Sequence, residues 1–176
     1  MTLRMQWGLM LGALLCTAVQ GQTTEEYRVK AAFLRNFPKF VEWPSQAFKN
    51  PSEPFAICVL GKNPFGDALA RAVSGGTVDG RPFSVLQIED PSPARICQIL
   101  FISASERRRL HSILGELKGA ATLTVGECDD FAEAGGVVNF KIEGGSIRLQ
   151  INPAAAAQQQ LHISAKLLSL AEIVKK

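Results

Sequence analysis

Few side chains in this 176-residue sequence are suited to catalysis or metal binding. Its two histidines, His111 and His162, have no histidine or cysteine partner at the spacing of a zinc site. The Gly-x-Ser-x-Gly motif that presents a hydrolase nucleophile is absent from the sequence. Asp129 and Asp130 are more typical of acids at a helix start than of a general acid–base pair. We therefore predict that the protein is not an enzyme, has no catalytic or metal-ligating residue, and needs no cofactor.

A second place where chemistry would be expected is the segment 61–66, Gly-Lys-Asn-Pro-Phe-Gly. It follows a predicted strand and precedes a predicted helix, and phosphate groups often bind at such a junction. The segment lacks the Gly-Lys-Ser/Thr ending of a P-loop, so we interpret it as a strand-to-helix turn. A crevice beside it, at the carboxyl ends of the parallel strands, is the alternative site for a small ligand.

The cysteines give the most specific prediction about bonding. Cys58 lies in the middle of a predicted strand, 55–60, and Cys97 lies at the start of another, 98–103. A doubly wound sheet with the order 2-1-3 makes these strands neighbours, about 5 Å apart, which suits a disulfide. We predict a Cys58–Cys97 bridge, and the alternative is a pair of buried free thiols. Cys128 precedes two acids that disfavour its thiolate, so we do not interpret it as a catalytic nucleophile.

The first residues have the pattern of a secretory signal. Arg4 supplies a positive charge, residues 7–19 are nearly all apolar, and small residues precede a cleavage site near Gly21. The apolar run of about 13 residues is too short to span a bilayer comfortably, and an uncleaved anchor is the alternative. We predict a signal peptide over 1–21 and a single domain over 22–176, exported to the periplasm, where disulfides form.

The charge balance argues against nucleic acid as a partner. The chain has 19 basic and 16 acidic residues, a formal net charge of +3, and cleavage of the signal would remove only Arg4. The one basic run, Arg107–Arg109, falls within a predicted helix, and we interpret it as a solvent-exposed helix face.

Helical and strand patterns alternate from Glu25 onwards. The predicted strands are 55–60, 83–88, 98–103, 121–125 and a hairpin of 137–142 with 146–151. The predicted helices are one that begins at Glu25, capped by Thr24 and broken at Pro38, then 67–73, 106–118 capped by Ser105, 129–134, and an amphipathic helix over 161–174. Buried strands separated by helices indicate an α/β three-layer sandwich. Its sheet is mixed and mostly parallel, with helices on both faces and a C-terminal antiparallel hairpin.

Aromatic side chains are densest near the first predicted helix. They are Phe33, Phe37, Phe40 and Trp43. Most of this cluster is expected in the core. Trp43 and Pro44 lie at the end of the helix, where partial exposure makes them a candidate surface for docking a partner.

Ordered matches along the chain resemble a known family. The first stretches are Val29-Lys30-Ala31-Ala32-Phe33-Leu34, Phe40-Val41-Glu42-Trp43-Pro44, Ile57-Cys58-Val59-Leu60-Gly61-Lys62 and Ile99-Leu100-Phe101-Ile102-Ser103. The later stretches are Leu123-Thr124-Val125, Gly135-Gly136-Val137-Val138-Asn139-Phe140 and Lys166-Leu167-Leu168. Through these stretches, which extend over nearly the whole mature chain, the sequence resembles the YfiR family (YfiR/HmsC-like) of periplasmic proteins.

The resemblance implies a periplasmic signalling repressor. The best-known members of the family hold an inner-membrane diguanylate cyclase inactive by binding its periplasmic sensor part, which lowers cyclic di-GMP and biofilm formation. An outer-membrane lipoprotein sequesters such a repressor and releases the cyclase. The resemblance also implies a homodimer. The alternative function is a periplasmic small-ligand-binding module that acts on another membrane sensor, such as a histidine kinase.

The resemblance also bears on the cysteines. The pair Cys58 and Cys97 fits the first disulfide of the family. A second family disulfide would use Cys128, but Ala-Gly-Gly stands at 134–136, where its partner is expected. The resemblance therefore implies that Cys128 is either unpaired or linked to a second chain.

Overall fold

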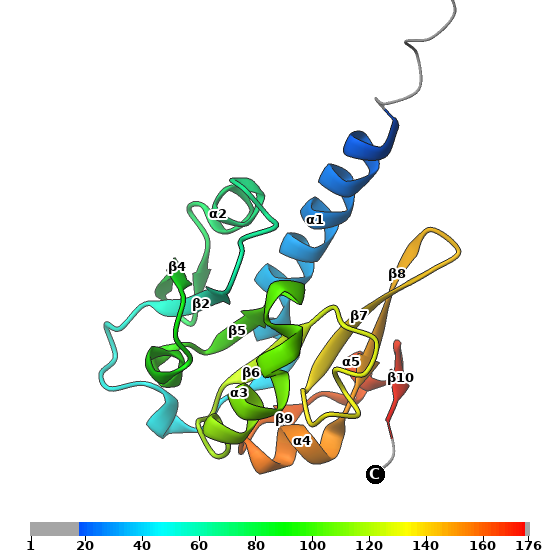
Figure 1. Ribbon diagram of the computed structural model, residues 1–176. Helices are drawn as coiled ribbons and strands as arrows, with labels where there is room; N and C mark the ends of the chain where they lie inside the picture. The colour runs from blue at the N-terminus through cyan, green and yellow to red at the C-terminus, as the bar shows by residue number, and fades with distance from the viewer. Residues whose placement is uncertain (1–17, 175–176) are drawn as a thin grey trace, which may run out of the picture.

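An eight-stranded sheet forms the centre of the computed structural model, which describes residues 18–174 (Figure 1). Its strands follow the order β10-β8-β7-β6-β5-β2-β4-β3. They are β2 (Phe55–Leu60), β3 (Thr77–Val78), β4 (Arg81–Ile88), β5 (Ile99–Ile102), β6 (Leu123–Gly126), β7 (Val138–Glu143), β8 (Ser146–Ile151) and β10 (Ala171–Ile173). Neighbouring strands are parallel except for the pairs β7–β8 and β3–β4, so the sheet is mixed and mostly parallel, as predicted.

Helices cover both faces of this sheet and confirm the three-layer α/β sandwich. The α-helices are α1 (Ala18–Asn36), α2 (Ala68–Val73), α3 (Leu110–Glu116), α4 (Pro153–Gln158) and α5 (Ala165–Leu168). Four 3₁₀ turns accompany them: η1 (Phe37–Lys39), η2 (Ser45–Ala47), η3 (Ser92–Ile96) and η4 (Ala104–Arg109). A separate antiparallel pair joins β1 (Val41–Glu42) to β9 (His162–Ile163). Figure 1 shows α1 and α3 on opposite sides of the sheet.

The central strand β2 shows how the sequence builds two cores. All six of its residues are buried, because helices cover it on both sides. Successive side chains of a strand point to opposite faces, so Ile57 and Val59 join the core under α1, whereas Cys58 and Leu60 join the core under α3.

The hairpin of β7 and β8 also agrees with the sequence prediction. Its ladder runs from the pair Val138 and Ile151 to the pair Glu143 and Ser146. Gly144 and Gly145 connect the strands with φ values of +57° and +77°. Two successive positive φ values are typical of the two-residue turn that matches strand twist, and glycine adopts them without steric strain.

The first helix differs from its prediction at one end. It begins at Ala18 rather than at Glu25, so Thr24 lies inside α1 and does not cap it. No proline interrupts this stretch, and nothing in its residues stops the helix from extending. The predicted break is confirmed, since α1 ends at Asn36 and Pro38 lies in the short turn η1. Most of the predicted signal peptide, residues 1–17, lies outside the described residues.

The prediction of one amphipathic helix over 161–174 is wrong. The segment instead forms β9, α5 and β10. Gln160 has a φ of +58°, which stops α4 before this segment begins. The Ser164 hydroxyl accepts a hydrogen bond from the Leu167 N–H and so starts a new, short helix. The chain then pairs with β8 in parallel, which adds a strand to the sheet edge.

Two other predicted helices are also corrected. The region 106–118 is divided between η4 and α3, and Ser103 rather than Ser105 caps it, because the Ser103 side chain accepts from the Ser105 N–H. The region 129–134 contains turns rather than a helix. Here the chain wraps around the buried ring of Phe131, which packs so closely on Gly126 and Gly136 that a Cβ at either position would clash.

The structure contains no membrane-spanning helix within residues 18–174, where no helix is both long and apolar enough to cross a bilayer.

Candidate functional site

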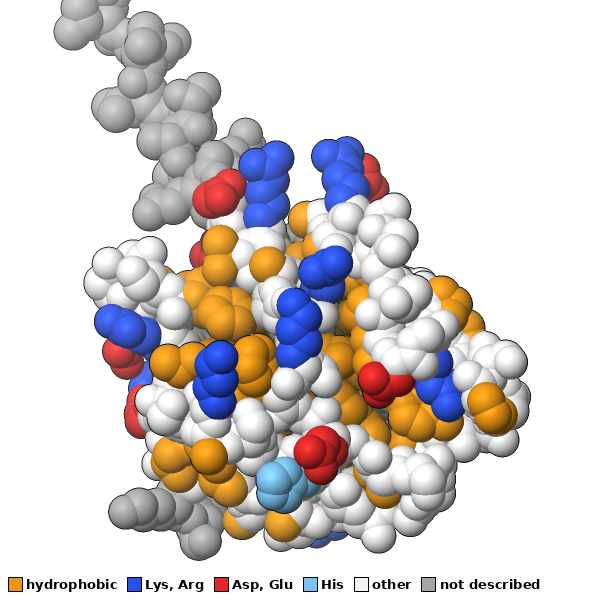
Figure 2. Space-filling view, turned by 180° about the vertical axis from the view of Figure 1, so that it is seen from behind, with side chains coloured by type: hydrophobic (Ala, Val, Ile, Leu, Met, Phe, Trp, Pro, Cys, Tyr) orange, Lys and Arg blue, Asp and Glu red, His pale blue; other side chains and the backbone are white. Residues whose placement is uncertain are grey.

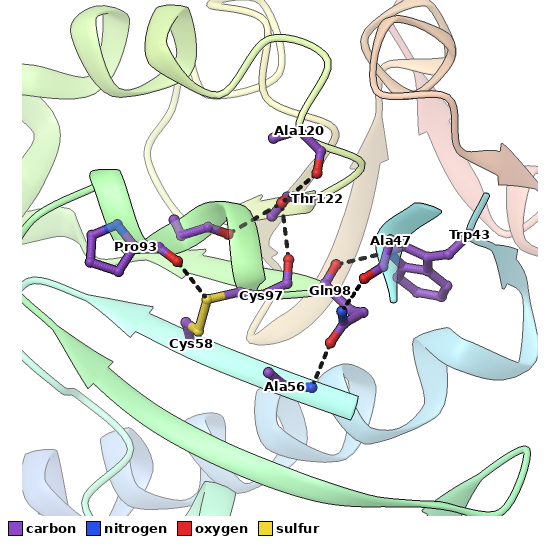
Figure 3. Close-up of a disulfide and its surroundings, with 10 residues drawn as sticks. Trp43, Ala47, Ala56, Cys58, Pro93, Cys97, Gln98, Ala120 and Thr122 are labelled. Carbon is purple, nitrogen blue, oxygen red and sulfur yellow. Dashed lines mark hydrogen bonds between the residues drawn. A yellow bond between two sulfur atoms is a disulfide. The ribbon is translucent and has the colours of Figure 1, made fainter. Parts of the chain in front are cut away.

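The two cysteines singled out in the sequence form a disulfide in the structure. Cys58 of β2 is bonded to Cys97, which follows η3, and their Cα atoms lie 5.9 Å apart (Figure 3). Both residues are buried in the core under α3. The Thr122 hydroxyl donates to the Cys97 carbonyl at 2.9 Å, which fixes the backbone beside the bridge. The disulfide is therefore part of a closed core and is not exposed to a partner.

Gln98 extends this closed region toward the first aromatic cluster. Its side-chain oxygen accepts from the Ala56 N–H at 2.7 Å, and its amide nitrogen donates to the Ala47 carbonyl at 2.8 Å. The Trp43 indole N–H donates to the Gln98 carbonyl at 3.0 Å (Figure 3). The side chain and backbone of this one buried residue thus link β2, η2 and the tryptophan that follows β1.

Trp43 is half-buried and has a structural role in this arrangement. Its ring packs edge-on against Phe55, with the ring centroids 5.0 Å apart. Pro44 is also half-buried and precedes η2. The docking of a partner on Trp43 and Pro44 stays a prediction, since these contacts account for the tryptophan without one.

Cys128 is unpaired within the described chain and buried beside Phe131 in the core under α3. Burial raises the pKa of its thiol, and the carboxylates of Glu127, Asp129 and Asp130 act in the same direction, while Arg107 opposes them. A buried, protonated thiol is a poor nucleophile. The burial favours the unpaired alternative over a link to a second chain.

The two histidines are separated and exposed. His111 lies on α3 and His162 on β9. Across residues 18–174, the structure brings together no group of three or more histidine, cysteine, aspartate or glutamate side chains suited to a metal ion.

The turn at 61–66 lies beside an open crevice of about 680 Å³ at the carboxyl ends of β2 and β4. Gly61 has a φ of +84°, and a Cβ there would clash with Ser105 and Glu106. The Lys62 N–H donates to the Ser105 hydroxyl at 2.9 Å, so this backbone donor is already used by the protein. Lys62, Arg108 and Arg109 line the crevice.

An apolar groove with a volume of about 530 Å³ lies on the other core, between α1 and β8. We call it the α1–β8 groove. It is lined by Val29, Ala32, Phe33, Asn36, Phe37, Lys39, Phe40, Ile147, Arg148, Leu149, Leu167 and Leu170. Apolar cavities of this size are the usual form of a binding site in proteins.

Large apolar side chains at the rim of this groove are exposed to solvent. Val29 of α1 is 40% exposed, and Leu170, after α5, is 70% exposed. Aromatic rings form the base, where Phe33 lies 6.3 Å from Phe37 and 5.7 Å from Phe140 between centroids. Figure 2 shows the face covered by α1, where hydrophobic side chains lie among lysines and arginines. A continuous open apolar surface of this kind is typical of an interaction site.

The charged residues at the groove are all basic. Lys39 and Arg148 line it, and the Lys166 ammonium lies 5.7 Å from the centre of the Phe40 ring. Within the described residues, no aspartate or glutamate lines the groove, and none of these three cations forms an ion pair.

A buried ionic cluster fixes α1, which is one wall of the groove. The Lys30 ammonium is 2.7 Å from the Glu127 carboxylate at the end of β6 and also contacts Glu26 one helical turn away. The Tyr27 hydroxyl donates to Glu127 at 3.1 Å, and burial together with the Glu127 charge raises the Tyr27 pKa. The side chains of Lys30 and Glu127 are 3% and 8% exposed, so water screens their attraction weakly.

Sequence reasoning missed the groove and this cluster. The sequence places most of the cluster Phe33, Phe37, Phe40 and Trp43 in the core, and its pattern does not indicate that Val29, one turn earlier, is exposed. The far wall comes from β8 and from Leu167 and Leu170, which were assigned to one long helix. The signal that was available is the spacing of Val29, Phe33 and Phe37, which places a second apolar stripe on α1 beside the buried one.

Comparisons with known proteins bear on the fold and the family. The structure is similar to that of a conserved domain protein from Vibrio cholerae, with a TM-score of 0.59 and 12% sequence identity. That match covers 85% of this chain and 60% of the other, so the present chain spans well under the full length of that protein. At such low identity the likeness supports the fold alone. No curated protein matched the sequence.

The family comparison agrees with the resemblance noted in the sequence. The model of the family described as YfiR/HmsC-like matches residues 27–172, a stretch that begins within α1, ends within β10 and includes every residue that lines the groove. This family is periplasmic and regulatory rather than catalytic. The disulfide between Cys58 and Cys97 fits an oxidising compartment. A match over this much of the chain shows that the protein belongs to the YfiR/HmsC-like family.

Proposed function

We propose that this protein is a periplasmic repressor that binds the periplasmic part of an inner-membrane diguanylate cyclase and keeps the enzyme inactive. Repression of this kind lowers cyclic di-GMP and biofilm formation. The family regulates diguanylate cyclase signalling from the periplasm, which supports the class of partner.

The observation that carries the proposal is the open α1–β8 groove. A regulator without catalytic chemistry acts by binding, and binding requires surface that the free protein leaves uncovered. Val29 and Leu170 keep apolar side chains in solvent at the rim of a cavity with an aromatic base. The closed region around the disulfide offers no comparable surface.

Measurement of cyclic di-GMP in cells tests the repressor function. The gene is deleted and then restored either in full or without residues 1–21, so that the protein stays in the cytoplasm. We expect cyclic di-GMP to increase on deletion and to return to its original level only with the full gene. An unchanged level in the deletion strain, under conditions in which the protein is made, would rule out cyclase repression.

Two partners complete the proposal. One is an outer-membrane lipoprotein that sequesters the repressor and so relieves the cyclase, and the other is a second copy of the chain in a homodimer. Sedimentation of the purified mature protein measures the dimer directly. Capture of the lipoprotein by the repressor, with release of the cyclase domain from it, tests the sequestration.

A second candidate function is small-ligand binding for another membrane sensor, such as a histidine kinase. The crevice of about 680 Å³ beside Gly61 favours it, because its three cations, Lys62, Arg108 and Arg109, outnumber Glu89 and Glu106 in the lining and leave a net positive charge suited to an anion. Native mass spectrometry of protein purified from the periplasm reports any ligand retained. An unliganded protein that binds no anion in titration would contradict this candidate.

A further inference from the structure

The wall of the groove formed by α1 has the dimensions of a helix-binding surface. Together with the turn that follows α1, it presents apolar residues three to four positions apart, namely Val29 and Phe33 of α1, Phe37 of η1, and Phe40 after η1. At 1.5 Å per α-helical residue and about 2.0 Å per residue of the 3₁₀ turn, this stripe is roughly 18 Å long, which is the length of about three helical turns. Grooves that receive an amphipathic helix contact it through side chains spaced i, i+3, i+4 and i+7, which require a length of this order.

The opposite wall leaves space for such a helix. It consists of Ile147 and Leu149 on β8 together with Leu167 and Leu170 at α5. The last of these is 70% exposed, and Val29 across the groove is 40% exposed. A helix seated between the two walls would bury both side chains, which contributes about 25 cal/mol for each Å² of apolar area removed from water.

The charges indicate which helix would fit. Lys39, Arg148 and Lys166 lie at the groove, and none of them has an ion-pair partner among residues 18–174. Elsewhere on α1, Arg28 and Lys30 are paired with carboxylates, whereas Arg35 has no ion-pair partner among the described residues. Unpaired cations around an apolar surface complement a partner with acidic residues and disfavour a basic one.

From this complementarity we infer that the α1–β8 groove binds an acidic amphipathic helix, with its apolar face against α1 and β8 and its carboxylates near Lys39, Arg148 and Lys166. The inference deepens the proposed function and rests on it in one respect, since the helix belongs to the periplasmic part of the membrane partner. The groove is concave, which favours an inserted segment over a flat lipid surface.

A pair of designed peptides tests this inference on the mature protein purified from the periplasm. Both have about 12 residues, enough for three helical turns, with leucine on one face and alanine on the other. The glutamate peptide carries glutamates beside the leucines, and the lysine peptide carries lysines at the same positions. We expect fluorescence anisotropy to show the glutamate peptide binding about tenfold more tightly at low salt, with the difference decreasing as salt screens the charges.

Charge reversal supplies the decisive comparison. The double variant Lys39→Glu/Arg148→Glu is expected to weaken the glutamate peptide about tenfold and to strengthen the lysine peptide. Lys49→Glu/Lys118→Glu makes the same change in overall charge at two exposed lysines that line neither the groove nor the crevice. It is the control and is expected to leave both affinities unaltered. Circular dichroism confirms that each variant is folded. Equal affinity for the two peptides, or no response to the double variant, would overturn the inference.

Other occupants give distinct outcomes that also overturn it. If laurate binds the protein and neither peptide does, the groove is a site for a small anionic amphiphile. If vesicles with anionic lipid bind the protein, lose that binding on Leu170→Ser, and neither peptide binds, the groove is a membrane contact. A dimer in sedimentation that dissociates on Leu170→Ser would show that a second copy covers the groove.

Cells separate the failure of this inference from the failure of the proposed function. If gene deletion increases cyclic di-GMP and the Lys39→Glu/Arg148→Glu protein restores repression fully, the repressor function stands and the groove inference is wrong. If deletion leaves cyclic di-GMP unchanged, the proposed function is wrong. The peptide experiment alone then shows whether the groove prefers an acidic helix. Loss of repression by the charge-reversed protein, with Lys49→Glu/Lys118→Glu still active, supports both.

Discussion

The region around the disulfide and the α1–β8 groove are both apolar, but only the region around the disulfide is fully covered by the rest of the protein. Around Cys58 and Cys97, side chains are buried and the neighbouring polar groups of Gln98 and Thr122 have hydrogen-bond partners. At the groove, Val29 and Leu170 remain in solvent.

This contrast separates residues that stabilise the fold from residues available for binding. Substitutions near the disulfide should change the free energy of unfolding. Substitutions at the rim of the groove should leave that free energy nearly unchanged and alter recognition. Four predictions test this separation, in order of decreasing effect on stability.

Removal of the disulfide should have the largest effect. The bond joins residues separated by 39 positions, and in the chain-entropy model a loop of that length contributes about 4 kcal/mol. We expect Cys58→Ala/Cys97→Ala to lower the free energy of unfolding in urea by that amount. Wild-type protein reduced with dithiothreitol serves as the control and should show a similar loss. A decrease below about 1 kcal/mol would mean that the closed region is held mainly by packing.

Loss of the buried cation of α1 should follow closely. Lys30→Met leaves the Glu127 carboxylate without its ammonium at 8% exposure, which costs about 3 kcal/mol. The matched control is Arg28→Ala, two residues earlier on the same helix. Arg28 pairs with Glu25 at the exposed surface, so removal of this pair should cost about 0.5 kcal/mol or less. Urea unfolding measures both. Equal losses would show that the buried pair has no special role in fixing the groove wall.

Trp43→Phe should have a smaller effect. The change keeps an aromatic ring against Phe55 but removes the hydrogen bond from the indole N–H to the Gln98 carbonyl, worth about 1 kcal/mol. Unfolding is followed by circular dichroism, because Trp43 is itself the fluorescent probe. If this variant kept full stability but lost repression, the original prediction of a docking surface at Trp43 would be restored.

Leu170→Ser should have the smallest effect on stability. The side chain is 70% exposed, and surface substitutions of this kind change the free energy of unfolding by about 0.5 kcal/mol or less. Repression in cells and peptide binding should nevertheless decrease. The distinction between the two regions fails if Leu170→Ser destabilises the protein by more than about 2 kcal/mol.

Local signals explain which parts of the fold could be predicted from the sequence. The continuous apolar run of β2 and the paired glycines of the β7–β8 turn specify their conformation through nearby residues. The region 161–174 has a helical spacing of apolar residues, but its conformation is decided by the distant strands β1 and β8, with which it pairs.

The groove could not be predicted for a related reason. Its walls come from distant parts of the sequence, and no local pattern predicts that Val29 and Leu149 line the same groove. Helical spacing identifies an apolar stripe on α1 but does not reveal whether another element covers it. The unpaired state of Lys39 and Arg148 also depends on tertiary neighbours, so their role in recognition emerges only from the folded structure.

The two edges of the sheet have a consequence for how the protein behaves when it is abundant. In the described chain, the outermost strands β3 and β10 contain two and three residues, and β10 carries Glu172, which lies 3.2 Å from Lys141. Long, flat, uncharged edges pair with other chains and start aggregation, whereas short and charged edges do not. The chain therefore resists edge pairing at β3 and β10. Among the described residues, however, β4 pairs with β3 only at Arg81 and Pro82, so its uncharged residues 84–88 are open along that side, and pairing with another chain would begin there.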